Sequence, residues 1–386
     1  MKDDSYYAES PADASKIAAN SLAYAQIMSI PTVLIIGFLY DMIGRRITTV
    51  VSFLMGAVST IMIPIVSPSI LGYDIARIIF CQTMVIMLSN PFINDYVTVQ
   101  SRGIATGFQT IGLTFGNLLS VGGIFTLTEM IDNKVISYGI MGVMQLIWAV
   151  LVYLMISEPT ILNDKEERHQ NKKSFCGKLF SMLRQAYKAC LQDPALFISL
   201  IGLIPSRNTA NLQQVNFTNW IASSKFGIPP DVQKSVWQKQ NIISNCFALP
   251  IVFLVGRLSD RMSPKVLVPS VLVFQIILMG GYMLCGDPTG WYAYVLSAFQ
   301  GGSGYAVIVA MQGYAVKRVP KMIRGIVMAL IISLSSLGGV IYLQVTKPFF
   351  ETAPNMVFGF IGIFDIIVLV FILICIALGK YGDIAP

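Results

Sequence analysis

Eleven long apolar runs dominate the chain and alternate with short polar turns. The turns are rich in Gly, Pro, Asn or charge, as at Ser67-Pro68-Ser69. A helix needs about 20 apolar residues to cross the hydrocarbon core of a bilayer, and its backbone groups must hydrogen-bond within the segment. The runs are too long for barrel strands and lack their alternation. We therefore predict an all-α polytopic membrane protein with eleven helices, at roughly 15–40, 47–66, 70–91, 104–128, 136–157, 195–222, 235–256, 265–285, 290–316, 325–347 and 355–379.

Composition and charge agree with this prediction. The 386 residues are 55% hydrophobic and 12% charged, too little charge to cover a soluble domain of this size. If the runs alternate in direction, 18 of the 27 basic residues fall on one side, which the positive-inside rule assigns to the cytoplasm. The net charge of +7 is therefore topological, and we expect a lipid bilayer rather than nucleic acid as the partner.

Several other kinds of chemistry are not indicated. The six cysteines are scattered without a C-x-x-C pair, and the single histidine, His169, lies in a polar segment, so no metal site or disulfide framework is expected. The Gly-rich string Gln300–Gly304 has no strand before it and no Lys-Ser/Thr after it, which favours close helix packing over a phosphate loop. No acids or histidines cluster at depth, so we predict neither an enzyme nor a cofactor.

The only long hydrophilic stretch, 158–193, divides the chain into segments 1–157, 158–193 and 194–386. Within it, an amphipathic pattern predicts an interfacial helix on the cytoplasmic leaflet, with a calmodulin-binding helix as the alternative. The apolar face of this helix is expected to hold Phe175, Leu179, Met182, Leu183, Ala186, Tyr187 and Cys190.

The two outer segments repeat one another. The string G-x-x-x-D-x-x-G-R-R at 37–46 has a partial copy at 256–265, and the two acids, Asp41 and Asp260, are 219 residues apart. The pair Arg102-Gly103 opens the fourth run as Arg324-Gly325 opens the tenth, at an offset of 222 residues. The two offsets agree closely, so we interpret the chain as a parallel duplication.

The string at 37–46 resembles the loop 2–3 signature of the major facilitator superfamily, and 256–265 resembles its second-half counterpart. The resemblance implies two six-helix bundles and a secondary transporter that works by alternating access. It also implies a gating set: Gly37, Asp41, Gly44, Arg45, Arg46, Arg102, Gly256, Asp260, Arg261 and Arg324. The alternative for Arg45 and Arg46 is a purely topological role. The second copy departs from the pattern, with Ser263-Pro264 where a glycine is expected.

The resemblance also implies twelve helices, one more than the apolar runs found here. The counterpart of run 195–222 would fall before residue 1, so segment 1–157 is expected to hold helices 2–6 and segment 194–386 helices 7–12. We expect either that the sequence is incomplete or that the protein has eleven helices.

Polar residues inside the runs are candidates for a solute site. In run 195–222, residues 207, 211, 214 and 218 share one helical face, which is costly in lipid unless it meets water, a ligand or a polar neighbour. The candidates for solute binding are Arg77, Arg207, Asn208, Asn211, Gln214, Asn241, Asn245, Gln300 and Tyr305. The alternatives are hydrogen bonds between helices and, for Arg77, a local pair with Asp74.

The intramembrane charges suggest the kind of solute. Two arginines and few acids favour a small anionic or zwitterionic organic solute, with a sugar as the alternative. Asp365, deep in the last run, is a candidate coupling residue for H⁺, or a buried structural partner. Asn117 replaces the proline of the family's antiporter motif, which weakens an antiport interpretation. We expect a monomer; the rival function is a non-transporting sensor, scaffold or inactive paralogue with the same fold.

Overall fold

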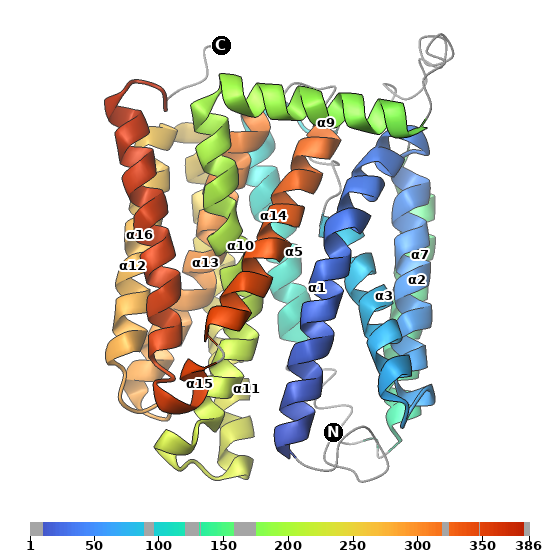
Figure 1. Cartoon of the computed structure of the whole chain (residues 1–386), viewed down its shortest axis with the longest axis vertical. Coiled ribbons are helices and arrows are strands. Elements are labelled where there is room, and N and C mark those ends of the chain that lie inside the picture. The colour runs from blue at the N-terminus through green and yellow to red at the C-terminus, as the bar shows by residue number, and fades with distance from the viewer. Residues whose placement is uncertain are drawn as a thin grey trace. The chain divides into compact units, whose positions relative to one another are not determined.

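The computed structural model of the chain describes residues 11–88, 96–119, 131, 133–157, 175–318, 324–346 and 348–381, and the described residues contain helices but no strand (Figure 1). Long helices occupy all eleven predicted runs. They are α1 (Pro11–Met42), α2 (Arg45–Ile65), α3 (Ile70–Leu88), α5 (Arg102–Leu119), α7 (Lys134–Met155), α10 (Pro194–Ala222), α11 (Pro230–Arg261), α12 (Pro264–Leu284), α13 (Trp291–Arg318), α14 (Arg324–Thr346) and α16 (Met356–Ala377). Shorter elements are η1 (Val99–Ser101), α9 (Phe175–Gln192), η4 (Ser224–Phe226) and α15 (Phe349–Thr352).

Several of these helices are long and apolar enough to cross a membrane. Among the described residues, seven meet this condition by length and composition. An eighth is added if Leu183–Gln192 and Pro194–Ile204, which meet at a bend of 109°, count as one broken span. The predicted all-α polytopic fold is confirmed.

Helix ends follow from local sequence. Gly44 joins α1 to α2 with φ of 118°, a backbone conformation that favours glycine. Asp193 caps α10 by accepting from the N–H groups of Ala195 and Leu196, and Pro194 occupies the first turn. In the second copy of the signature, Ser263-Pro264 stands where a glycine is expected. Pro264 likewise lies at the start of a helix, α12.

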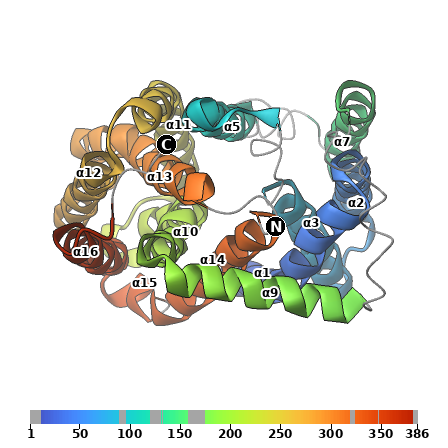
Figure 2. The same cartoon turned by 90° about the horizontal axis from the view of Figure 1, so that it is seen from above.

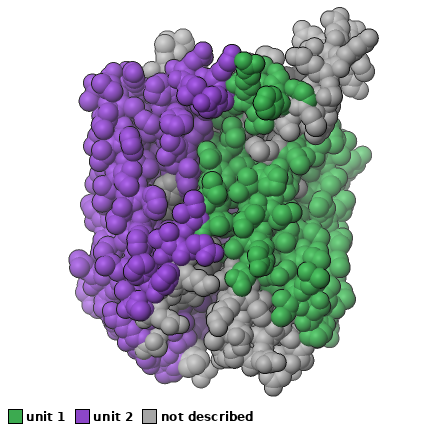
Figure 3. Space-filling model, in the orientation of Figure 1, with its two compact units in different colours: residues 1–96, 126–186, 321–340 green, residues 97–125, 187–320, 341–386 purple. Residues whose placement is uncertain are grey.

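The chain forms two compact units (Figure 3). Unit 1 contains residues 1–96, 126–186 and 321–340, and unit 2 contains 97–125, 187–320 and 341–386. Helix α5 therefore belongs to the unit that holds most of the second half of the chain, and the first part of α14 belongs to the other. The division into 1–157, 158–193 and 194–386 stays a prediction about the repeat.

In unit 1, small and polar side chains join the helices. A Cβ on Gly142 of α7 would lie 2.5 Å from the Ile61 side chain of α2, so the two helices are in close contact. Between α1 and α14, Ser29 donates to or accepts from Ser336 at 2.9 Å, and the Ser333 hydroxyl donates to the Ile30 carbonyl. Ser333 and Ser336 thus supply hydrogen bonds between helices, as expected for packing in a membrane.

In unit 2, an aromatic cluster and an asparagine join the ends of α10, α12 and α16. The rings of Phe217, Trp220, Tyr282 and Phe358 contact one another, with Tyr282 stacked on Phe358 at 4.7 Å. Asn355 accepts from the Trp220 indole at 2.9 Å and donates to the Cys285 carbonyl at 2.6 Å. Figure 2 shows α12 beside α16 and α5 beside α11.

Helix α9 occupies the segment predicted to be amphipathic. Ala186 and Cys190 are buried, at 0% and 7% exposure, whereas Tyr187 is 64% exposed, together with Phe180 and Leu191. Successive helical residues differ by about 100° in direction, so Tyr187 points away from the buried side chain of Ala186. The composition of the apolar face and the interfacial location of α9 stay predictions.

Candidate functional site

The second signature copy provides a hydrogen-bonded contact between α11 and α5. The Asp260 carboxylate, at the end of α11, accepts from the N–H of Gly103 at 2.9 Å and from that of Ile104 at 2.8 Å. These are two of the N–H groups that have no partner inside α5, at the end where the helix dipole favours negative charge. The contact thus places one of the two signature acids at the N-terminus of another helix.

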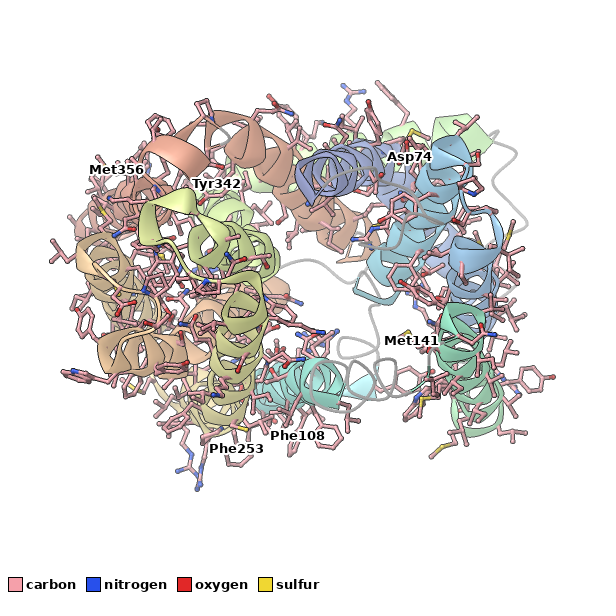
Figure 4. All side chains as sticks on the ribbon, turned by 90° about the horizontal axis from the view of Figure 1, so that it is seen from below. Asp74, Phe108, Met141, Phe253, Tyr342 and Met356 are labelled. Carbon is pink, nitrogen blue, oxygen red and sulfur yellow. The ribbon has the colours of Figure 1, made fainter. Side chains whose placement is uncertain are left out.

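Three glycines allow this contact. A Cβ on Gly103 would lie 2.6 Å from the Asp260 carboxylate and 2.8 Å from the Gly256 carbonyl. A Cβ on Gly256 would lie 3.2 Å from the Gly107 Cα. Farther along the same pair of helices, Phe108 and Phe253 meet edge to face at 5.9 Å (Figure 4). Helix α5 thus packs directly against the backbone of α11.

Helix α13 adds a cation to the contact. Lys317 donates to Asp260 at 2.9 Å and to the Ser259 carbonyl at 3.1 Å. Its neighbour Arg318 donates to Asp193, the cap of α10, at 2.7 Å. Burial works against the charge of Arg318, but the bonds to Asp193 raise the pKa of its guanidinium. The basic C-terminal end of α13 therefore binds the acids of α10 and α11 at the predicted cytoplasmic side.

The first signature copy is described only in part. The Arg45 guanidinium lies 6.0 Å from the Tyr40 ring centroid, and that of Arg46 lies 3.9 Å from the ring of Tyr153 in α7. Both arginines thus pack on aromatic rings. The side chains of Gly37, Asp41 and Arg324 lie outside the described residues, Arg102 is buried at the start of α5, and Arg261 is exposed. Their gating role stays a prediction.

Amide side chains lie on α11 and α13, two helices that pack against each other. Asn241 and Asn245 donate to the carbonyls of Trp237 and Asn241, four residues earlier in α11. Gln300 of α13 is 0% exposed, and neither its amide nitrogen nor its amide oxygen has a hydrogen-bond partner in the described part of the chain. A buried amide without partners is costly, which sets Gln300 apart from the other candidates.

The residues after Gln300 bring α13 against α11. A Cβ on Gly301 would lie 2.3 Å from the Ser244 hydroxyl, and one on Gly302 would lie 2.4 Å from the Ile251 side chain. The predicted packing role of this Gly-rich string is confirmed.

Tyr305 and Asn117 meet in unit 2. The Asn117 amide of α5 donates to the Tyr305 hydroxyl of α13 at 3.0 Å. Thr110 and Thr114, on the same helix as Asn117, instead donate to backbone carbonyls one turn earlier. The structure therefore joins Tyr305 to the residue that replaces the antiporter-motif proline.

The remaining candidates are placed less completely. The side chains of Arg207, Asn208, Asn211 and Gln214 in α10 lie outside the described residues. Arg77 of α3 is partly buried, and its Nε has no partner among the described residues. Asp74 accepts instead from Ser21, so the described residues do not contain the alternative Asp74–Arg77 ion pair.

Asp365 lies buried in α16 and accepts from the Gln275 amide of α12 at 2.8 Å. Sequence reasoning did not find Gln275, nor the role of Lys317 beyond topology. The only signal for Gln275 is a single amide in an otherwise apolar run, and its partner depends on how two distant helices are aligned.

Comparisons with known proteins identify the family. The family model of the Major Facilitator Superfamily matches residues 11–343. No curated protein sequence matches the chain significantly. The fold is similar to that of the proton:xylose symporter XylE bound to 6-bromo-6-deoxy-D-glucose, with a TM-score of 0.66 and 16% identity over 94% of this chain and 87% of that one. It is also similar to the human organic anion transporter MFSD10 (TETRAN), with a TM-score of 0.65 and 12% identity over 92% of this chain and 83% of that one. Because the family model covers most of the chain, the chain belongs to the major facilitator superfamily of transporters.

Proposed function

We propose that this protein moves a small polar organic solute, anionic or zwitterionic, across a membrane by alternating access. The solute binds between the amide-bearing helices of the second half, and the Asp260 contact opens and closes the cytoplasmic side. The protein makes no covalent change to the solute.

The buried amide of Gln300 carries this proposal. A buried amide offers two donors and one acceptor, and leaving them unpaired costs about 1–3 kcal/mol. Such a group calls for an explanation, and we attribute the unpaired amide of Gln300, at 0% exposure, to a polar ligand that binds at α13.

Nearby side chains extend the polar surface. The Nδ2 groups of Asn241 and Asn245 are used by the backbone of α11, which leaves their carbonyl oxygens as acceptors. On the same helix as Gln300, the Tyr305 hydroxyl accepts from Asn117 and keeps its own proton to donate. These groups are suited to a solute that both donates and accepts hydrogen bonds.

The intramembrane arginines support an anionic or zwitterionic solute. The Asp365 side chain accepts from Gln275, and the Asp74 carboxylate accepts from Ser21. Neither acid is in an ion pair with Arg77 among the described residues, so this arginine of unit 1 is a candidate for contact with an anionic group. Arg207, on the polar face predicted for α10 of unit 2, is the second candidate cation.

The contact at Asp260 supports a conformational cycle. The acid joins α5, from the first repeat, to α11 and α13, from the second, through two hydrogen bonds and one ion pair. A few such bonds can be exchanged for water at modest cost, as a gate requires.

A sugar is the second candidate, because amides without charge are the usual partners of hydroxyl groups. The two structural neighbours are named as a proton:xylose symporter and an organic anion transporter, so the fold accommodates either class. A non-transporting sensor is the remaining alternative.

Uptake into proteoliposomes tests the proposal. Labelled carboxylates, amino acids and sugars are offered to the wild type, Gln300→Leu and Arg77→Gln. Uptake of a carboxylate or amino acid that both variants lose supports the proposal. Uptake of sugars alone, with Arg77→Gln unaffected, supports the second candidate.

Gln240→Leu is the matched control. Gln240 is a buried glutamine in the same unit, but its amide donates to the Pro288 carbonyl at 2.7 Å. This variant should keep uptake. Binding of a panel solute without uptake by any protein would favour the sensor.

A further inference from the structure

A carboxylic acid and an amide meet between α12 and α16, which lie side by side (Figures 1 and 2). Gln275 donates its Nε2–H to the Asp365 Oδ2 at 2.8 Å, and both side chains are 0% exposed. Asp365 lies nine residues into the 22-residue α16, about 14 Å along its axis. The pair is therefore near the middle of a hydrocarbon core that is about 30 Å thick.

The remaining oxygen of each side chain has no donor. Asp365 Oδ1 and Gln275 Oε1 are buried and without a hydrogen-bond partner among the described residues. Among the described residues, the ion pairs in unit 2 join Lys317 to Asp260 and Arg318 to Asp193, and neither involves Asp365. An ionised Asp365 would thus be a buried charge with no cation paired to it among the described residues, beside two acceptors without a hydrogen.

A proton on Asp365 would remove both the buried charge and the lack of a hydrogen between the two unpaired oxygens. A protonated Asp365 is neutral, and its O–H is a donor that a planar amide can accept through Oε1 while its Nε2–H remains bonded to the other carboxyl oxygen. A carboxylic acid and a primary amide are complementary in this way, each with one donor and one acceptor. Gln275 is therefore suited to the neutral acid and not to the carboxylate.

The described side chains next to the pair are apolar. The side chains one turn from the pair include Leu272, Met279 and Val368, which are buried and apolar. A Cβ on Gly362 would contact Met279, and one on Gly202 of α10 would contact Val368, so the helices enclose the pair. The other titratable groups of α16, of the helices that contact it and of the residues just after it are Lys265, Tyr282, Asp193, Tyr342, Cys375, Lys380 and Tyr381. The side chains of Arg207 in α10 and Glu351 in α15 are also titratable, and they lie outside the described residues.

We propose that Asp365 and Gln275 form a proton-binding site inside the membrane, and that this proton is the ion coupled to solute movement. In this conformation the carboxyl O–H bond is intact. When the helices move and water reaches the pair, the O–H bond breaks, the electron pair stays on the carboxylate and the proton passes to water. The coupling part rests on the proposed function; occupancy by a proton does not.

Infrared spectroscopy of the protein in lipid at neutral pH tests occupancy. The wild type should show the carbonyl band of a protonated carboxylic acid, with a shift in D₂O, and Asp365→Asn should lose it. Asp260→Asn is the control, because Asp260 is ion-paired and should contribute no such band. The absence of any protonated-acid band that Asp365→Asn removes would overturn the proposal.

A second variant tests the site without removing the acid, in case Asp365→Asn does not fold. Gln275→Leu leaves the acid in place but removes its partner, so the band should move to higher frequency. An unmoved band would show that Gln275 does not hold the proton and would overturn the site. Asp365→Asn, which resembles the neutral acid, should keep the thermal stability of the wild type.

Uptake with and without an acid gradient tests coupling. The gradient should stimulate uptake by the wild type and not by Asp365→Asn. Equal stimulation of both proteins would overturn the coupling even if the band is present. If no solute is carried by the wild type, the proposed function fails, whereas the infrared band still decides occupancy by the proton.

Discussion

Asp260 and Gly103 are 157 residues apart in the chain, yet the carboxylate of one accepts the backbone N–H of the other at 2.9 Å. Because the glycine has no Cβ, the acid reaches the first turn of α5, where it also accepts from Ile104. This contact joins the two repeats at the predicted cytoplasmic end, so its strength should govern how readily that end opens.

Removal of the Asp260 carboxylate should expose the start of α5. Hydrogen bonds to a charged group contribute about 1.5–3 kcal/mol, so Asp260→Ala should speed amide exchange at Gly103 and Ile104 by roughly 30-fold. Exchange measured by mass spectrometry over 103–107 checks this. Asp287→Asn, which alters a cap on an exposed turn, should leave that peptide unchanged; equal exchange in Asp260→Ala and wild type would refute the role of the contact.

A methyl group added at Gly103 should destabilise the protein, whereas one added at Gly112 of the same helix should stabilise it. The Cβ of Gly103→Ala would lie 2.6 Å from the acid, and such overpacking costs about 1–3 kcal/mol. Gly112 has open space around its Cβ position, so Gly112→Ala should stabilise the helix by about 0.5–1 kcal/mol. Thermal unfolding in detergent compares the two variants, and a Gly103→Ala protein as stable as Gly112→Ala would contradict the close approach.

Substitution of Gln300 by an apolar residue should abolish uptake without lowering the stability of the protein. Since its amide is buried and unpaired, Gln300→Leu should leave stability unchanged or raise it by about 1–2 kcal/mol, although uptake is lost. Gln240→Leu should instead lower stability by about 1–2 kcal/mol, because it removes the bond to Pro288. Unfolding midpoints of both variants, beside their uptake, decide this; a large loss of stability in Gln300→Leu would indicate an internal structural role.

The cap of α10 should depend on Asp193 in two separable ways. Asp193→Ala removes both the cap and the ion pair with Arg318 and should cost about 2 kcal/mol. Asp193→Ser keeps a capping oxygen and should recover about half of that loss. If serine is no better than alanine in thermal unfolding, the cap does not contribute.

Hydropathy alone predicted the helices, because each run must satisfy its own backbone in lipid. The packing of Gly301 and Gly302 was also readable, since glycine runs in a membrane helix serve close contact. The repeat located Asp260, although its copy of the signature is the less regular one.

What the sequence did not predict depends on the alignment of distant helices. Gln275 and Asp365 are 90 residues apart and lie in apolar runs that carry no signal for their pairing. Lys317 belongs to a basic cluster that predicts topology equally well without the bond to Asp260.

Uptake by the purified protein in vesicles tests the central claim most directly. Wild type, Gln300→Leu and Gln240→Leu would be reconstituted side by side and offered carboxylates, amino acids and sugars. We predict saturable uptake of one anionic or zwitterionic class by wild type and Gln240→Leu, and none by the stable Gln300→Leu protein. Uptake that survives in Gln300→Leu, or a folded wild type that carries no solute of the panel, would contradict the account.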